Sequence, residues 1–234
     1  MDLYFGIGLP QVPRANRPWL YSTGHLERAP GWIPIYRDLH GAVYLRVHPR
    51  NRANLARVAN TYAREGVPFD EERGFDPAAV IRAAPDWAVA HGLVPGDFAS
   101  LESDVSGPDP ARRRWALDRL ASIWLALGAY DESIAIDRRL LRSNPGANAP
   151  TRRLVWALLR EDRTLEAREA ARGLARAREG GISATIAAAA RSAEEGADPD
   201  ERIGRTARLP VFTRAEASQI ASGLAERPGR PWRE

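Results

Sequence analysis

Apolar side chains between residues 111 and 179 recur with a period of 34 positions. Leu120 and Leu154 are separated by this interval (154 − 120 = 34), and so are Leu140 and Leu174 (174 − 140 = 34). Each lies on the apolar face of a stretch with helical periodicity. The spacing therefore predicts two helical hairpins, with antiparallel helices at about 114–127, 131–143, 149–160 and 164–178.

The first hairpin carries its turn signals in the order expected of a helical repeat. Gly128 ends the first helix, Tyr130 starts the second, and Asn144-Pro145 stops it. The second hairpin matches less well, because Asp162 replaces the glycine and Thr164 the aromatic residue. The first unit resembles the tetratricopeptide family at Leu120, Ala121, Trp124, Gly128, Tyr130, Leu140 and Pro145. An ordinary pair of helical hairpins is the alternative.

The tetratricopeptide resemblance implies a protein-binding surface rather than a particular chemistry. In that family the first helix of each unit lines a concave groove, and a basic groove with one aromatic residue favours an acidic peptide. In the alternative, Trp156 packs against a neighbour and the arginines are simply solvated. Counting from Arg114 and Asn148, the expected peptide-binding groove consists of Asp118, Arg119, Ser122, Arg152, Arg153, Trp156 and Arg160.

Residues 32–47 give the clearest β pattern, with two apolar, partly β-branched runs around the turn RDLHG. This pattern predicts a β-hairpin, in which Pro34 should lie on a sheet edge because it cannot donate to a ladder. A helix is expected at 52–65, with Asn51 as its N-cap. Its apolar face should pack on the hairpin and contains Leu55, Val58 and Tyr62.

The same region carries a second resemblance, over residues 2–69. The matching positions are Trp32, Tyr36, Asp38, Val43, Tyr44, Leu45, Arg46 and Asn51. They resemble the extracytoplasmic tail of certain bacterial multi-pass, glycosyltransferase-like membrane proteins. This resemblance implies a location at the extracytoplasmic face of the inner membrane. The catalytic residues of that family would lie in its membrane part, so none is carried over.

The whole chain is predicted to be mainly α-helical, with a small α/β region at its start. Asp76-Pro77 and Pro85 should open short helices, residues 93–110 should form a loop, and 196–210 should be irregular. Thr213 and Glu216 form a capping box for a last helix. The expected divisions are the α/β region 1–69, the connector 70–110, the two repeats 111–179, and capping helices with a frayed tail at 180–234.

Composition excludes several kinds of chemistry. Cysteine is absent, and all 34 basic residues are arginine. Thiolate nucleophiles, zinc–thiolate sites and lysine Schiff bases are therefore excluded. The net charge is only +4, and arginine alternates with glutamate along the expected helices, which is typical of solvated faces. Nucleic-acid binding is thus disfavoured, although a helical-repeat RNA binder is one alternative function.

A soluble enzyme or metal protein built around the region from His25 to His48 is the other alternative. This region also contains His40 and Asp38, but no histidine pair has the spacing of a helix-borne metal motif. Asp38 is better interpreted as a turn residue. We therefore expect a non-catalytic interaction module with no metal or cofactor and with a protein or peptide partner.

No apolar run is long enough to cross a bilayer. The opening MDLYFGIGLPQVPRAN lacks the basic end and the apolar stretch of a signal peptide. The chain as written is therefore expected to be soluble and to carry no export signal.

Overall fold

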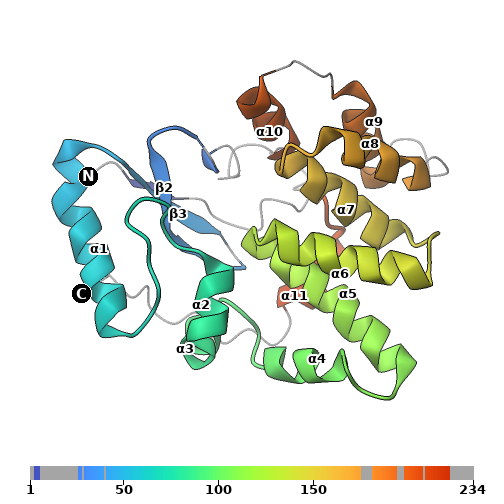
Figure 1. The fold of residues 1–234 in the computed structure, drawn as a ribbon, viewed down its shortest axis with the longest axis horizontal. Helices are drawn as coiled ribbons and strands as arrows, with labels where there is room; N and C mark the ends of the chain where they lie inside the picture. The colour runs from blue at the N-terminus through green and yellow to red at the C-terminus, as the bar shows by residue number, and fades with distance from the viewer. Residues whose placement is uncertain are drawn as a thin grey trace.

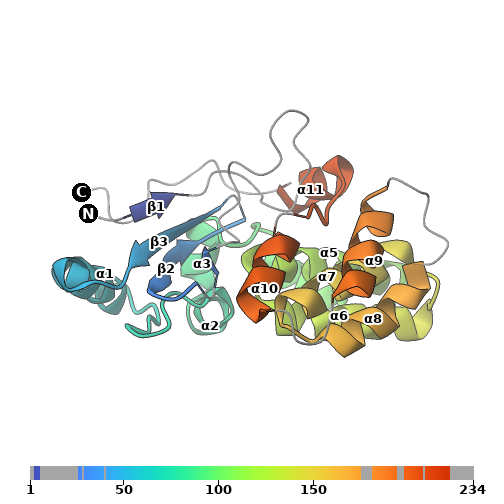
Figure 2. The same cartoon turned by 90° about the horizontal axis from the view of Figure 1, so that it is seen from above.

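The computed structural model describes residues 3–5, 26–27, 29–39, 41–174, 181–193, 198–207 and 209–221. These residues form a mainly helical protein with one small antiparallel sheet. The sheet lies in one half of the molecule with the early helices, and the repeat helices fill the other half (Figures 1 and 2). This arrangement confirms the expected fold class, a mainly helical chain preceded by a small α/β region.

The sheet contains three strands in the order β1-β3-β2. The predicted hairpin is formed by β2 (Trp32–Arg37) and β3 (Ala42–Arg46). Its turn is closed by Asp38, whose Oδ1 accepts a hydrogen bond of 2.8 Å from the Gly41 amide, as expected of a turn residue. Strand β1 (Leu3–Phe5) is a short extended segment that pairs antiparallel with β3.

Pro34 lies on the edge strand β2, as predicted. The loop after α1 covers this edge, because the Phe75 amide donates to the Pro34 carbonyl at 2.8 Å. The neighbouring Gly74 has a φ of +87°, and a Cβ atom there would lie 2.2 Å from the Pro34 oxygen. Only glycine therefore fits the position at which the loop meets the strand.

Helix α1 (Arg52–Arg64) packs on the hairpin, as predicted. Val58 and Tyr62 are buried, and the Tyr62 hydroxyl donates to the Ile35 carbonyl at 2.8 Å. Leu55 is only partly buried. Asn51 does not cap the helix with its side chain, contrary to the prediction. Its side-chain Nδ2 donates to the Arg46 carbonyl at 3.0 Å and so connects the start of the helix to β3.

Three short helices connect the sheet to the repeats: α2 (Pro77–Ala83), α3 (Pro85–Ala90) and α4 (Phe98–Asp104). Asp76 caps α2 as expected, accepting from the Ala78 amide at 2.9 Å. The prediction of a loop at 93–110 was wrong for α4. The side chains of Phe98 and Leu101 are buried and hold this helix against the core. The Phe98 and Trp124 rings pack edge-to-face, with 5.6 Å between their centroids.

The 34-residue period produces four packed helices close to the predicted positions. They are α5 (Pro110–Leu127), α6 (Tyr130–Ser143), α7 (Asn148–Arg160) and α8 (Thr164–Ala171), the last extended by a 3-10 turn, η3 (Arg172–Leu174). Consecutive helices pack against one another in sequence. Helix α5 begins four residues earlier than predicted, because Asp109 caps it by accepting from the Ala111 amide at 2.8 Å.

The turn inside each hairpin uses the same backbone conformation. Gly128 ends α5 with a φ of +80°, and Asp162, 34 positions later (162 − 128 = 34), has a φ of +57°. Asp162 tolerates the left-handed region, which aspartate visits more readily than bulky residues. The turn of the second unit therefore has the same left-handed backbone conformation as that of the first, although it lacks the glycine.

The C-terminal part adds α9 (Ile182–Ser192), α10 (Pro199–Ala207) and α11 (Arg214–Ala221). The capping box is confirmed: the Thr213 amide donates to Glu216 at 2.6 Å, and the Glu216 amide donates back to the Thr213 hydroxyl at 3.2 Å. The prediction of an irregular 196–210 was wrong, since α10 lies there. The last residues of the expected frayed tail, 222–234, lie outside the described residues.

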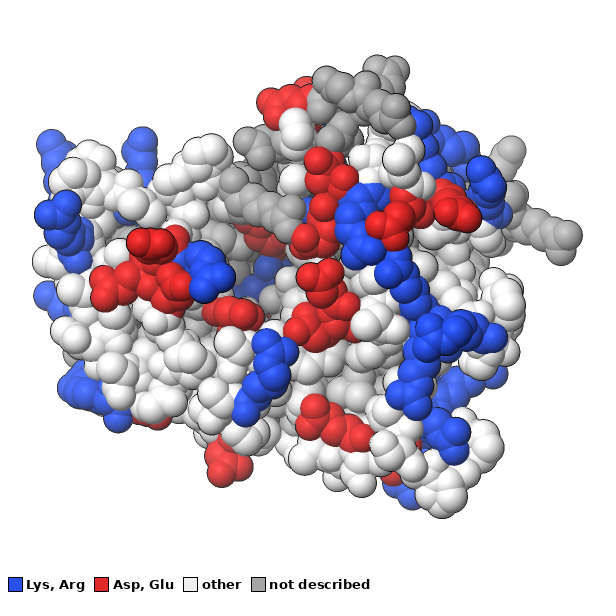
Figure 3. Space-filling model, in the orientation of Figure 1, with Lys and Arg blue, Asp and Glu red and all other residues white. Residues whose placement is uncertain are grey.

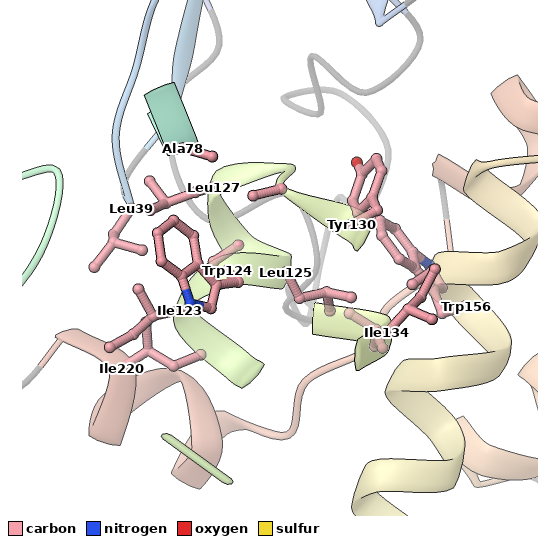
Figure 4. Close-up of a cluster of buried hydrophobic side chains, with 14 of the residues drawn as sticks. Leu39, Ala78, Ile123, Trp124, Leu125, Leu127, Tyr130, Ile134, Trp156 and Ile220 are labelled. Atoms are coloured by element: carbon pink, nitrogen blue, oxygen red, sulfur yellow. The ribbon is translucent and has the colours of Figure 1, made fainter. Parts of the chain in front are cut away.

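One hydrophobic core runs from the sheet through the repeats to α11. In Figure 4, Trp124 lies among Leu39, Ile123 and Ile220, and Tyr130 lies beside Trp156. The last two rings meet edge-to-face, with 5.7 Å between their centroids. In the described part of the chain no helix is both long and apolar enough to cross a membrane.

Candidate binding groove

Helices α5 and α7 are the first helices of the two repeat units, and they contact one another. Helix α7 carries a row of side chains at four-residue intervals, Asn148, Arg152, Trp156 and Arg160, that lie on one face of the helix. We call this row the α7 stripe. Helix α10 packs against α7, and α11 packs against α5. The C-terminal segment therefore covers the surface that was predicted to be an open groove.

The prediction of an open peptide-binding groove was wrong for most of its residues. Arg152, Arg153, Trp156, Arg160 and Ser122 are all buried, with Arg153 fully enclosed. Neither a solvated row of arginines nor a groove ready for an acidic peptide exists at these positions. The predicted alternative was correct for Trp156, which packs against Tyr130.

The side chains of the α7 stripe bind backbone carbonyls of the C-terminal segment. Arg152 Nε donates to the Val211 carbonyl at 2.8 Å, and Trp156 Nε1 donates to the Leu209 carbonyl at 3.1 Å. Arg160 Nη1 donates to the Ile203 carbonyl at 2.6 Å. Arg152 also forms an ion pair with Glu216. The donors predicted to bind a peptide are thus used within the chain.

Arg153 lies beside the stripe and joins three helices. Its Nη2 donates to Asp137 of α6 at 2.6 Å and to Asp118 of α5 at 2.8 Å. Burial lowers the pKa of Arg153, but the two carboxylates more than offset this, and the net shift is upward. Burial also raises the pKa of Asp137 to about 6, against the opposing effect of Arg153. These three residues form a structural ion cluster.

A second buried cluster is centred on Glu27 and connects the N-terminal region to both repeat units. Its carboxylate forms ion pairs with Arg37 of β2 and Arg160 of α7, and it accepts from the Tyr130 hydroxyl at 2.6 Å. Burial raises the pKa of Glu27, but Arg37, Arg160 and Tyr130 together bring it down to about 2. Glu27 therefore stays ionised at neutral pH.

Arg37 also occupies the space beside the turn of the first repeat. Its Nη2 donates to the Ala126 carbonyl at 3.0 Å, near the C-terminus of α5, where a cation is favoured by the helix dipole. A Cβ atom on Gly128 would lie 2.4 Å from Arg37 Nη1. Glycine is therefore required at position 128 for two reasons: its left-handed backbone conformation and the close approach of the Arg37 guanidinium group.

The remaining predicted groove residues lie nearer the start of α5. Arg119 pairs with Asp97 at 2.9 Å, and its guanidinium lies 5.5 Å from the centre of the Trp115 ring. The Ser122 hydroxyl donates to the Asp118 carbonyl within the helix at 3.0 Å. Asp118 keeps 45% of its side chain exposed. Asp118 lines a cavity that is open to solvent.

That cavity lies between the first half of α5, the end of α6 and the start of α7, and its volume is about 580 Å³. Trp115, with 51% of its surface exposed, forms part of the wall. No side chain caps the first turn of α7 within the described residues. The cavity is lined by Ala111, Arg114, Trp115, Asp118, Leu140, Asn144, Ala147, Asn148, Ala149 and Pro150. We call this the open pocket.

The open pocket was missed because the groove residues were counted from the second turn of α5. Trp115 stands in the run RRRW, and its neighbours Arg112 and Arg113 are engaged elsewhere: Arg112 pairs with Asp104 at 3.4 Å, and Arg113 donates to the Gly107 carbonyl at 2.8 Å. An exposed tryptophan on the face shared with Asp118 was a signal that could have located the pocket.

The histidine region gives no support to an enzyme or metal site among the described residues. His48 is exposed and accepts from the Arg50 amide at 3.2 Å, while His91 stacks on Trp87 at 4.0 Å. His25 and His40 lie outside the described residues. Within the part of the chain that is described, no group of three or more potential ligands could hold a metal ion.

Charges on the surface are mixed in sign. On the face shown in Figure 3, acidic and basic side chains both lie over the sheet half and over the repeat helices. Exposed pairs such as Arg138–Glu166 and Arg82–Glu132 belong to this pattern.

A comparison of the chain with known protein families, with curated proteins and with solved structures found no match.

Proposed function

We propose that the protein is a non-catalytic interaction module that binds an extended peptide segment of a partner in the open pocket. The observation that carries this proposal is the half-exposed Trp115 in the wall of a cavity of about 580 Å³ at the uncovered end of the repeat surface. Large exposed aromatic residues are enriched among those that dominate binding energies at interfaces.

The polar lining suits a ligand with a carboxylate beside an apolar group. Arg114 is exposed on the rim, and the uncapped N-terminus of α7 directs its helix dipole at the same space. Asp118 is the opposing charge, but it is paired with Arg153. The side-chain amide of Asn144 can donate to and accept from a peptide backbone. Asn148 can donate its NH₂ group, while its Oδ1 accepts from the Ser183 hydroxyl at 2.7 Å. An acidic peptide thus remains the preferred partner, at a different place from the one predicted.

A peptide selection tests this proposal. A displayed library of random decapeptides is selected on immobilised wild-type protein, on Trp115→Ala and on a control, Leu165→Ala, which removes a side chain that is 65% exposed on α8. Peptides pairing an aspartate or glutamate with an apolar residue should be enriched on the wild type and on the control. Their enrichment should fall by about tenfold or more on Trp115→Ala.

Equal enrichment on Trp115→Ala would show that the open pocket is not the binding site. An additional variant, Arg114→Glu, separates the two parts of the ligand. It should remove the preference for acidic residues while the apolar preference remains, because it reverses the charge at the rim and leaves the tryptophan in place.

The resemblance of residues 2–69 adds a location to this proposal. The matching positions from Trp32 to Asn51 lie in the hairpin and in the 3-10 turn Pro49–Asn51 that precedes α1, and this supports a role as the interaction part of a bacterial glycosyltransferase-like membrane system. Co-purification of the protein with such a membrane protein after mild detergent extraction is the expected outcome. Recovery without any membrane protein would contradict this part of the proposal.

A further inference from the structure

The C-terminal segment lies on the α7 stripe in the manner of a bound peptide. Among the described residues, its polar contacts with the stripe include three main-chain carbonyls, those of Ile203, Leu209 and Val211, and one carboxylate, that of Glu216. Recognition of backbone carbonyls by fixed side-chain donors is independent of the sequence of the bound segment. The carboxylate and the apolar residues then supply selectivity.

Residues 209–213 lie outside the helices and strands. At the ends of this stretch the Leu209 amide donates to the Thr206 carbonyl at 3.0 Å, and the Thr213 carbonyl accepts from the Ala217 amide at 3.0 Å. The donors that reach the Leu209 and Val211 carbonyls come from the α7 stripe. Val211 and Phe212 are fully buried and belong to the hydrophobic core that also contains Trp156 of the stripe. Glu216 serves both sides, since one carboxylate oxygen binds Arg152 and the other closes the Thr213 capping box.

We propose that the α7 stripe is a second peptide-recognition site, occupied within the chain by residues 203–216. Its partner in trans is a segment of the same chemistry: two apolar residues followed by a helix start in which a Thr or Ser and a Glu form a capping box. The internal segment competes with this partner and closes the site. The site shares no residue with the ligand contacts assigned to the open pocket except Asn148, so either proposal can fail without the other.

The internal segment competes effectively because it is tethered. A linked ligand acts at an effective concentration in the millimolar range, so a free peptide of equal intrinsic affinity binds poorly to the closed site. Weakening the internal segment alone should therefore raise the affinity for a free peptide. This prediction distinguishes an intramolecular ligand from an ordinary part of the core, whose loss would merely destabilise the fold.

The test measures fluorescence anisotropy of a labelled peptide of residues 209–221 with full-length proteins. The wild type is compared with Glu216→Gln and with Phe212→Ala, and Leu101→Ala, which removes an equally buried side chain from α4, is the matched control. The two segment variants should bind the peptide about tenfold or more tightly than the wild type, and the control should not. A peptide carrying Glu216→Gln should bind about tenfold more weakly, because the charge-assisted contact with Arg152 is lost.

Binding that is equal in the wild type and the Glu216→Gln variant, or raised equally in the Leu101→Ala control, would overturn the proposal. Should Phe212→Ala fail to fold, hydrogen exchange on the wild type decides. Amides of residues 211–220 should exchange through a local opening that leaves α7 protected. Exchange of these amides only together with those of α7 would show that the segment is a permanent part of the core.

Discussion

The two ends of the surface formed by α5 and α7 are built from similar side chains but have opposite environments. At the closed end, Arg160 and Trp156 are almost fully buried, whereas at the open end Trp115 is half exposed and Arg114 lies at the rim. The sequence pattern of the two ends is alike, an arginine close to a tryptophan on a helix. Coverage by the C-terminal segment decides which of them is structural.

The energetic consequences differ accordingly. A buried guanidinium must be paired, and removing its partner leaves an uncompensated charge at a cost of about 3–5 kcal/mol. An exposed aromatic or charged side chain contributes little to stability, and substitutions there usually change it by within about 0.5 kcal/mol. Substitutions at the two ends should therefore separate folding from binding.

The largest effect is expected for Arg153→Glu at the closed end. The new carboxylate would stand beside the fully buried Asp137 and near the half-exposed Asp118, and the cost should be at least about 3–5 kcal/mol. Since small domains are stable by only about 5–15 kcal/mol, much of the protein should unfold at 25 °C. Circular dichroism measures this. The exposed Arg142→Glu on α6 is the control, and a variant as stable as that control would show that Arg153 is not structural.

The next effect is that of Glu27→Gln, which should cost about 3–5 kcal/mol at pH 7 because Arg37 and Arg160 both lose their counter-ion. The pKa of Glu27 falls from an unfolded value of 4.5 to about 2 in the folded protein. Ionised Glu27 therefore stabilises the fold fully above pH 4.5, and this stabilisation is lost as the pH falls through 2.

Urea titrations at several pH values test the Glu27 prediction. The stability difference between wild type and Glu27→Gln should be constant above pH 5 and should shrink between pH 4.5 and 2. Glu71→Gln, in an exposed part of the connector, provides the baseline. A difference that does not depend on pH would mean that packing, and not the charge of Glu27, joins the two regions.

The smallest effect is expected for Trp115→Ala at the open end. Its free energy of unfolding should fall by only about 2 kcal/mol, because about half of the Trp115 surface is already in water. Trp156→Ala is the counterpart at the closed end and should cost about 3–5 kcal/mol. Similar losses for the two tryptophans would remove the distinction between the ends.

Local patterns predicted the helices of the repeats well, because a helix shows its apolar face every three to four residues. They also placed Arg152, Trp156 and Arg160 correctly on one face of α7. They could not show that this face is covered, because the carbonyls that Arg152, Trp156 and Arg160 bind are 59, 53 and 43 positions away in the chain. The Glu27 cluster was equally invisible, because its partners are 10, 103 and 133 positions away.

The long sequence separation of the Glu27–Arg160 pair has a consequence for the order of folding. The hairpins α5–α6 and α7–α8 close loops of only a few residues and can form rapidly, whereas a contact across 133 positions must bring distant chain segments together. Glu27 therefore joins its partners after the repeats have formed. Its contribution should appear mainly in the rate of unfolding, so that Glu27→Gln accelerates unfolding and leaves the refolding rate nearly unchanged.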